Sequence, residues 1–383
     1  MPTIELRTTA VAAGGDAVAR DADGKVTFVT GALPGERVRA DVTDERHDFN
    51  RAVAVEILDA APGRVAPPCP HVARGCGGCG WQHIELSTQR ALKIEIVTDA
   101  LRRIGGIAEP DVRHGPHLPA EGFRTSVRLA RASEGAGVGF RHARSHDVVD
   151  VDSCLVAHPL LVELMGKVDM THASEVTLRC GARTGDLLAI GDGPITAPAG
   201  VRIGPKAWLT EEVAGRTWRI SAKSFFQARP DGADALVALV RRAADGAPSG
   251  AMIDAYGGVG LFAGTVGHDR DVTILEWSTS SAKDARENVP GAKVVTTDVS
   301  KWRPSRAALV VADPPRAGLG KAGVPRLVGT GASHIVVISC DPASLARDAK
   351  LLVAAGYRHN GTALVDLFPH TPHIEAVTRF IRT

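Results

Sequence analysis

Long apolar runs are missing from this 383-residue sequence: no stretch of about 18 apolar residues is present that would cross a bilayer. The first residues, MPTIELRTTAV, lack the basic and then apolar arrangement of a signal peptide. Internal repeats and low-complexity tracts are absent too, and 44% apolar residues argue against long disordered stretches. We therefore expect a soluble, cytoplasmic protein of two or three domains with no membrane partner.

Aromatic residues are scarce, at 4% of the chain, so the core must be built mainly from Val, Leu, Ile and Ala. The formal net charge is only +2, and it therefore points to no partner. Arginine outnumbers lysine, and its forked guanidinium is suited to phosphates. The cysteines are few, and in a cytoplasmic chain they favour a metal site or catalysis over a disulfide framework: Cys69, Cys76, Cys79, Cys154, Cys180 and Cys340.

Composition and pattern divide the chain into three parts. Residues 1–60 read as about five short strands with Gly-rich turns, which predict a small OB-like barrel. Residues 61–222 begin with a proline-rich linker and then predict a β-rich middle domain. Within them, 86–106 predicts a helix that is able to pack on the C-terminal part. Residues 223–383 alternate short apolar runs with helical patterns, which is typical of an α/β domain with a mostly parallel sheet.

A glycine-rich turn follows the apolar strand at 252–256. Gly258 and Gly260 let a ligand approach the backbone at the carboxyl edge of the sheet. Glu276, at the end of the next strand, can accept both ribose hydroxyls of a nucleoside. This spacing alone allows NAD, but D-x-Y-x-G-x-G resembles motif I of class I methyltransferases, which bind S-adenosylmethionine. Asp298, after the following strand, is a candidate for the adenine or an ordinary cap.

Segments at the ends of the later strands make the resemblance specific. Five motifs, taken in order, resemble those of the RNA uracil-C5-methyltransferase family, which makes 5-methyluridine in rRNA and tRNA. They are SFFQ, DAYGGVG, DPPRAGLG, SCDPASLARD and DLFPHTPHIEAV. The match covers residues 224–383 strongly, and the first 60 residues resemble a TRAM domain, an OB-like RNA-binding barrel. The resemblance implies a class I, Rossmann-like methyltransferase domain behind that barrel and the β-rich middle domain.

The chemistry of this family needs a thiol and a base. Uracil C5 is a poor nucleophile until a thiolate adds to C6, and a base must afterwards remove the C5 proton. By resemblance, Cys340 is the nucleophile and Glu375 the base. Cys340 precedes a helix start, which favours a lowered pKa of its thiol. Asp341 stands where many relatives have Asn, and its charge is able to raise the pKa of that thiol. The resemblance also implies cofactor or uracil contacts for Gln227, Tyr256, Glu276 and Asp313.

A cluster C-x6-C-x2-C with a distant fourth cysteine offers four soft ligands: Cys69, Cys76, Cys79 and Cys154. Spacing alone leaves both tetrahedral zinc and an iron–sulfur cluster open. The family resemblance implies a [4Fe-4S] cluster with a structural or RNA-shaping role, and zinc remains the alternative. A radical S-adenosylmethionine centre is disfavoured, because its ligands have the spacing C-x3-C-x2-C. Cys180 fits no pattern and is expected in the core.

Residues 123–146 contain one acid, Glu134, and arginines that alternation would place partly on one sheet face, as a track for phosphates: Arg124, Arg128, Arg131, Arg141 and Arg144. We expect a monomer that methylates uridine in RNA, with 23S rRNA favoured over tRNA. Two alternatives stay open. One is an RNA cytosine-C5 methyltransferase, which usually has a second cysteine in a Pro-Cys motif. The other is a non-catalytic iron–sulfur RNA-binding protein.

Overall fold

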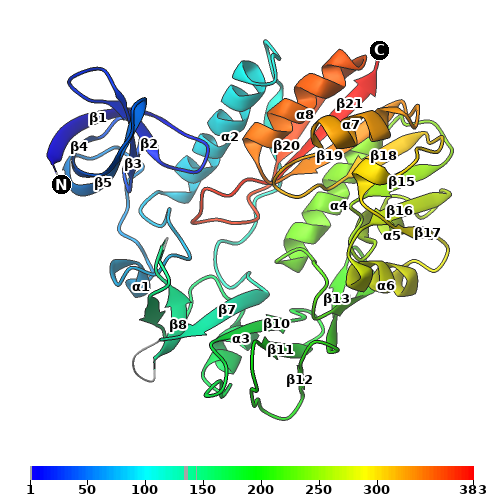
Figure 1. Cartoon of the computed structure of the whole chain (residues 1–383), viewed down its shortest axis with the longest axis horizontal. Coiled ribbons are helices and arrows are strands. Elements are labelled where there is room, and N and C mark those ends of the chain that lie inside the picture. Colours follow the sequence, from blue (N-terminus) through cyan, green and yellow to red (C-terminus); the bar gives the residue numbers. More distant parts are fainter. Residues whose placement is uncertain (1, 133–136, 144) are drawn as a thin grey trace.

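A closed five-stranded barrel forms the N-terminal part of the computed structural model, which describes residues 2–132, 137–143 and 145–383 (Figure 1). The barrel confirms the prediction from the short strands. Small buried side chains such as Ala17, Ala19 and Ala40 fill its narrow interior. Its strands, in the order β1-β2-β3-β5-β4, are β1 (Thr3–Val11), β2 (Ala17–Arg20), β3 (Val26–Thr30), β4 (Arg37–Glu45) and β5 (Phe49–Asp59).

The middle part is built on a six-stranded sheet of order β12-β11-β10-β7-β8-β9, as its alternating pattern predicts. All its pairs are antiparallel except β11 with β12. One face packs against α3 through Leu129, Leu161 and Leu178. The elements are α1 (Pro70–Ala73), β7 (Ser126–Arg131), β8 (Val138–Arg141), β9 (Val148–Asp150), α3 (Pro159–Met165), β10 (Glu175–Cys180), β11 (Leu187–Gly191), β12 (Val201–Ile203) and the hairpin of β13 (Trp208–Val213) with β14 (Arg216–Ser221).

The C-terminal part is an α/β domain around an eight-stranded sheet of order β17-β16-β15-β18-β19-β21-β20-β6. Strands β15 to β19 are parallel, and β21 runs antiparallel between β19 and β20. Because helices cover both faces, β18 and β19 are buried along their whole length. The strands are β15 (Met252–Ala255), β16 (Val272–Glu276), β17 (Lys293–Thr296), β18 (Leu309–Ala312), β19 (His334–Ser339), β20 (Tyr357–Leu364) and β21 (Ala376–Arg382).

Two apolar cores lie on the two faces of this sheet. The first core is covered by α4 (Pro230–Ala244), α5 (Leu261–Thr265) and α6 (Thr279–Asn288). The second core, on the opposite face, is covered by α2 (Leu86–Arg103), α7 (Gly320–Val328) and α8 (Pro342–Ala354). A short 3-10 turn, η1 (Val299–Lys301), adjoins the second core. Helix α2 packs on α8, and β6 (Val112–His114) pairs with β20 as the eighth strand. The chain therefore contributes to the C-terminal sheet before it forms the middle one. Within the described ranges, no helix is long and apolar enough to span a bilayer.

Candidate active site

Parallel strands of the C-terminal sheet end at one edge, where the predicted site residues follow them. The registers of β15, β16 and β18 place Ala255 beside both Leu275 and Ala312. Residues that come next in each strand therefore lie side by side, at the carboxyl edge where α/β sheets bind ligands. They are Tyr256, Glu276 and Asp313.

The turn after β15 has a backbone shaped for close approach of a ligand. Tyr256 has φ +60°, a conformation that costs a non-glycine residue about 1–3 kcal/mol and is concentrated at functional sites. Gly260 has φ +93°, and a Cβ there would lie 2.8 Å from Cγ2 of Val289, so glycine is required. The buried carboxylate of Asp254 accepts a hydrogen bond from Ala263 N–H at 2.8 Å, and burial raises the pKa of Asp254 to about 7.

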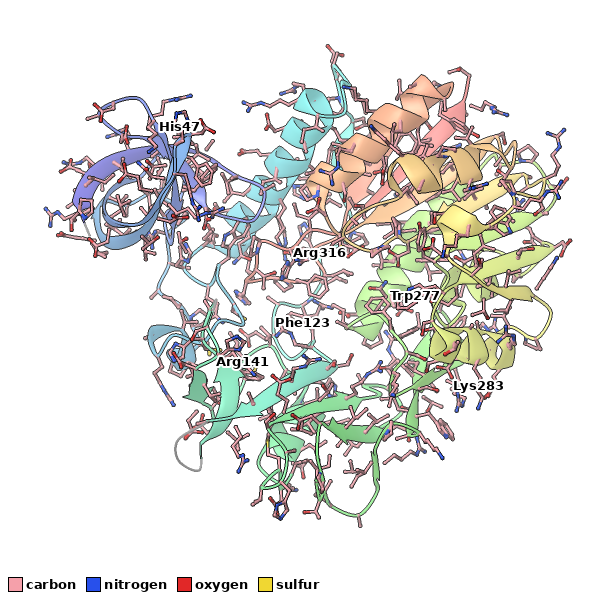
Figure 2. The ribbon with its side chains drawn as sticks, viewed as in Figure 1. His47, Phe123, Arg141, Trp277, Lys283 and Arg316 are labelled. Atoms are coloured by element: carbon pink, nitrogen blue, oxygen red, sulfur yellow. The ribbon has the colours of Figure 1, made fainter. Side chains whose placement is uncertain are left out.

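Glu276 is held at its strand end by two backbone amides. Gly258 N–H donates to Oε2 at 2.9 Å, and Ser278 N–H donates to Oε1 at 2.6 Å. Each carboxylate oxygen keeps a further lone pair, so Glu276 can still accept ribose hydroxyls. Burial raises the pKa of this carboxyl. The next residue, Trp277, is 73% exposed on the side that faces the middle sheet (Figure 2). The sequence analysis missed it, although its position directly after the acid predicted to bind the ribose was a signal.

Two cavities meet beside this turn. The smaller one, of about 30 Å³, is lined by Phe225, Phe226 and four predicted residues: Gln227, Tyr256, Gly258 and Asp313. Gln227 Nε2 donates to Asp313 Oδ2 at 3.3 Å. The larger cavity, of about 530 Å³, lies against the middle sheet and shares Phe225, Phe226 and Gln227 with the smaller one. The larger cavity is wide enough for a base-sized reactant, whereas the smaller one has about the volume of one water molecule and marks only where the glycine turn meets Gln227.

Asp298 has a structural partner of its own. Its Oδ1 accepts a hydrogen bond from Ser300 N–H at 2.8 Å and caps the 3-10 turn η1. It is nevertheless near the site, because burial and then the charge of Asp298 raise the pKa of Tyr256 to about 12. Its contact with an adenine stays a prediction.

The antiparallel pairing of β19 with β21 brings Cys340 and Glu375 together. Ser339 pairs with Ala376 in this register. Cys340 follows Ser339 and Glu375 precedes Ala376, so the two residues lie opposite one another at the edge that also holds Asp313. Glu375 is buried. The sheet therefore places a thiol and a carboxyl group in reach of the same bound molecule.

The electrostatics of Cys340 correct one expectation. Burial, followed by the charges of Glu375 and Asp313, raises the pKa of the thiol to about 11, and Arg316 opposes this only in part. The expected lowering by the helix start is therefore wrong, because burial and two carboxylates outweigh it. Glu375 is affected in the same way: burial and then Asp313 raise its pKa well above the ordinary value. Burial raises the pKa of Asp313 to about 7.

Asp341 acts as the cap of helix α8. Its Oδ1 accepts a hydrogen bond from Ser344 N–H at 2.7 Å, which an asparagine at this position would also do. The charges that act on the neighbouring thiol come from other residues. The aspartate at position 341 therefore keeps the helix cap that the asparagine of many relatives would make.

Arg316 and His373 are a second pair that the sequence analysis missed. Arg316 Nη2 lies 3.0 Å from His373 Nδ1, and Figure 2 shows Arg316 facing the space toward the middle sheet. Burial, and then the charge of Arg316, lowers the pKa of His373 to about 4. The imidazole is therefore neutral and accepts the hydrogen bond. Their places in DPPR and TPHIE were the available signal.

Four cysteines surround one cavity in the middle part. The cavity has about 300 Å³ and is lined by backbone of Gly77 and Gly78, by Arg124 and by four free thiols: Cys69, Cys76, Cys79 and Cys154. Burial raises the pKa of Cys79 to about 11. Residues 2–132, 137–143 and 145–383 contain no group of three or more His, Cys, Asp or Glu arranged to hold a metal ion. Cys180 lies in the core of the middle sheet, as expected.

The predicted arginine track is only partly on one face. Arg128 and Arg141 share a face and both contact Glu175, with N–O distances of 3.7 and 2.5 Å. Arg131 lies an odd number of residues along β7 from Arg128, so it points to the other face. Arg124 lies at the cysteine cavity. Arg144 and Glu134 lie outside the described residues.

Comparison with known proteins agrees with this geometry. The sequence model of the family tRNA (Uracil-5-)-methyltransferase matches residues 298–382. An uncharacterized RNA methyltransferase of Streptomyces avermitilis is 36% identical over 97% of this chain and 96% of its own. The 23S rRNA (uracil(1939)-C(5))-methyltransferase of Halomonas elongata is 32% identical over 97% of this chain and 88% of its own.

A solved structure shares the whole fold. The tRNA (uracil-54, C5)-methyltransferase of Pyrococcus abyssi, crystallised with S-adenosyl-L-homocysteine, superposes with a TM-score of 0.76 at 23% identity, over 99% of this chain and 100% of that chain. The structure shows the shared fold, and the relatives that are 32–36% identical over 97% of this chain show that it belongs to the RNA uracil-C5-methyltransferase family of enzymes.

Proposed function

We propose that this enzyme methylates uridine C5 in 23S rRNA through a covalent adduct on Cys340. The observation that supports it most directly is the register of β19 and β21, which sets Cys340 opposite Glu375 at the sheet edge that also carries the glycine turn, with β18 between β15 and β19. The rRNA substrate is supported by the relative from Halomonas elongata, which covers nearly the whole chain.

The turn after β15 fits S-adenosylmethionine. Glu276 would hold the ribose, while the close backbone at Gly258 and Gly260 and the side chains of Tyr256 and Gln227 would hold the rest. The cofactor supplies an electrophilic methyl group for C5. All other steps fall to side chains of this chain.

Cys340 makes C5 reactive. Once its thiol has lost its proton to solvent water, Sγ forms a bond to C6 and the C5–C6 π electrons move toward C5 and the O4 carbonyl, which leaves an enolate. Asp313, with a pKa of about 7, is in part protonated at neutral pH and would then donate a hydrogen bond to the developing oxyanion. Gln227 holds Asp313 by its amide.

Glu375 completes the reaction. After C5 carries the methyl group, the carboxylate of Glu375 removes the C5 proton, the C5–C6 double bond reforms, and the Sγ–C6 bond breaks to return the thiolate. Because Glu375 is buried next to Asp313, its carboxylate is a stronger base than an exposed glutamate. The raised pKa therefore suits the role of base.

We also propose that Cys69, Cys76, Cys79 and Cys154 hold a [4Fe-4S] cluster, with zinc as the alternative. A cluster of this kind is held by four cysteine thiolates, and the proposal is supported by four free thiols that line one cavity, although the thiols of the described residues are not arranged around a metal position. The barrel would serve as a TRAM-like RNA-binding module. Arg128 and Arg141 would contact phosphates on the middle sheet.

The test uses anaerobically purified protein, S-adenosylmethionine and unmodified 23S rRNA carrying tritium at uridine C5. We expect tritium release to water by wild type and by Cys180→Ala, whose thiol lies in the middle core, and none by Cys340→Ala. Unmodified tRNA in parallel tests the substrate. Methyl transfer to cytidine, or to another atom of uridine, would overturn the proposal.

A further inference from the structure

The segment between β20 and β21 has little regular structure, yet it ends on Glu375. Within residues 365–375, Val365 N–H donates to Glu375 O at 2.8 Å, and Thr371 Oγ1 donates to Phe368 O at 2.7 Å. His370 has φ +65°, which is strained for a non-glycine residue. Such a loop needs outside contacts to stay in one place. We call residues 366–375 the catalytic loop.

Helix α2 supplies the first of these contacts. Lys93 is fully buried, and its Nζ donates to Asp366 Oδ1 at 2.6 Å and to Phe368 O at 3.1 Å. Gln89, one turn earlier, accepts a hydrogen bond from His370 N–H at 2.7 Å. Both buried side chains thus fix backbone or carboxylate of the catalytic loop.

Trp81 supplies the second contact, from the segment that follows Cys79. Its backbone N–H donates to His370 O at 2.9 Å, and its indole Nε1–H donates to Gly15 O in the barrel at 3.1 Å. Gln89 Nε2 in turn donates to Trp81 O at 3.1 Å. The buried indole therefore lies between the catalytic loop and the barrel.

The barrel touches the catalytic loop directly through Gly15. This residue has φ +97°, and a Cβ on it would stand 2.5 Å from Cβ of Pro372 and 2.8 Å from Nε1 of Trp81. Leu33 and Val11 of the barrel also pack in the apolar core shared by α2 and the C-terminal sheet. Figure 1 shows the loop between β1 and β2 directed toward α2. The barrel is thus packed on the catalytic loop.

We propose that Gly15, Trp81 and Lys93 are positioning residues, through which the barrel and α2 hold the catalytic loop so that Glu375 stands opposite Cys340. The barrel then contributes to release of the finished product as well as to RNA binding. This inference rests on the proposed function, since it gives Glu375 the role of base.

The proposal has a chemical signature. Cys340 is placed by β19 and the capped helix α8, whereas Glu375 ends the loop that is hydrogen-bonded to Lys93 and Trp81. A displaced loop therefore leaves addition to C6 and methylation of C5 intact and slows removal of the C5 proton. The Sγ–C6 bond then persists, and a methylated, denaturation-stable adduct between enzyme and RNA accumulates.

The experiment compares Gly15→Ala with Gly14→Ala. Gly14 is in the same turn with φ +104°, so both changes impose the same backbone strain, but no atom lies within 4 Å of a Cβ at Gly14. We expect Gly15→Ala to lower kcat for tritium release by about tenfold to a hundredfold, as misplacement of a catalytic group by about 1 Å does. The KM for RNA should stay within about twofold of Gly14→Ala, and the adduct should appear only in Gly15→Ala.

Trp81→Phe is a second variant, which keeps an aromatic ring and the backbone bond to His370 and removes the indole N–H that donates to Gly15, together with part of the ring volume. Trp81→Phe should accumulate the same adduct at a lower level. If Gly15→Ala fails to fold, the presence or absence of the adduct in Trp81→Phe tests the proposal. Equal kcat and no adduct in either variant, or a rise in KM alone, would overturn the proposal. A wild type that releases no tritium would instead overturn the proposed function.

Discussion

Cys340 and Glu375 face one another because Ser339 pairs with Ala376, yet they are held by different supports. The thiol follows a buried central strand and precedes the capped helix α8, whereas the carboxyl group ends a loop that depends on α2 and the barrel. The proposed nucleophile and the proposed base can therefore be removed separately, and each removal should stop the reaction at a different stage.

We expect Glu375→Gln to stop the reaction after methylation. Glutamine keeps the shape of the side chain but cannot take the C5 proton, so tritium release should fall by about 10²–10⁴-fold. The methylated adduct on Cys340 should accumulate and survive denaturation. Gel mobility of labelled RNA after denaturation, with methyl label from the cofactor, measures it.

The double variant Cys340→Ala/Glu375→Gln is the matched control and should form no adduct. If Glu375→Gln releases tritium at the wild-type rate, another group is the base.

Activity should rise with pH up to the pKa of Asp313. In the proposed mechanism Cys340 and Glu375 act in their ionised forms, and burial with neighbouring carboxylates raises the pKa of each, so their active fraction grows with pH until Asp313, with a pKa of about 7, loses the proton that it donates. Asp313→Asn removes one of the raising charges while keeping an oxygen for Gln227. The pH profile of single-turnover tritium release should then shift toward lower pH, although its maximum falls. An unshifted profile would show that Asp313 does not act on these groups.

Much of this site could be predicted from the sequence because it lies at strand ends. Apolar runs mark the strands, and the residue that follows each run reaches the carboxyl edge whatever the helices do. Glu276, Asp313 and Cys340 are of this kind. The barrel and both sheets were likewise predicted from local pattern, since strands alternate or run apolar according to the faces they bury.

The errors and omissions arise from contacts between distant segments. The pKa of Cys340 depends on burial and on Glu375, which reaches the thiol only through sheet pairing. No local pattern shows that Lys93 finds Asp366 or that Arg316 finds His373. A helix start beside the thiol was visible in the sequence, and the carboxylates that outweigh it were not.

Cysteine variants should separate a cluster from an isolated core thiol. We expect Cys154→Ser to lose most of its iron and acid-labile sulfide after anaerobic purification, because it removes one of four thiols around the cavity. Cys180→Ser, in the core of the middle sheet, should keep the wild-type content of both. Metal analysis of the two proteins measures this. One zinc per chain and no sulfide in the wild type would contradict the cluster.

Glu276 and Asp298 should differ in their effect on cofactor affinity, although both follow strands at the same edge. Glu276 is buried against the amides of Gly258 and Ser278, so Glu276→Gln removes a charged acceptor from the ribose position. We expect the Kd for S-adenosylmethionine to rise by about tenfold to a hundredfold, since a hydrogen bond to a charged group contributes about 1.5–3 kcal/mol. Asp298→Asn should change it by less than about twofold, because asparagine caps η1 as aspartate does. Calorimetric titration of both variants measures this; an equal rise in both would mean that Asp298 binds the cofactor and that its capping bond is incidental.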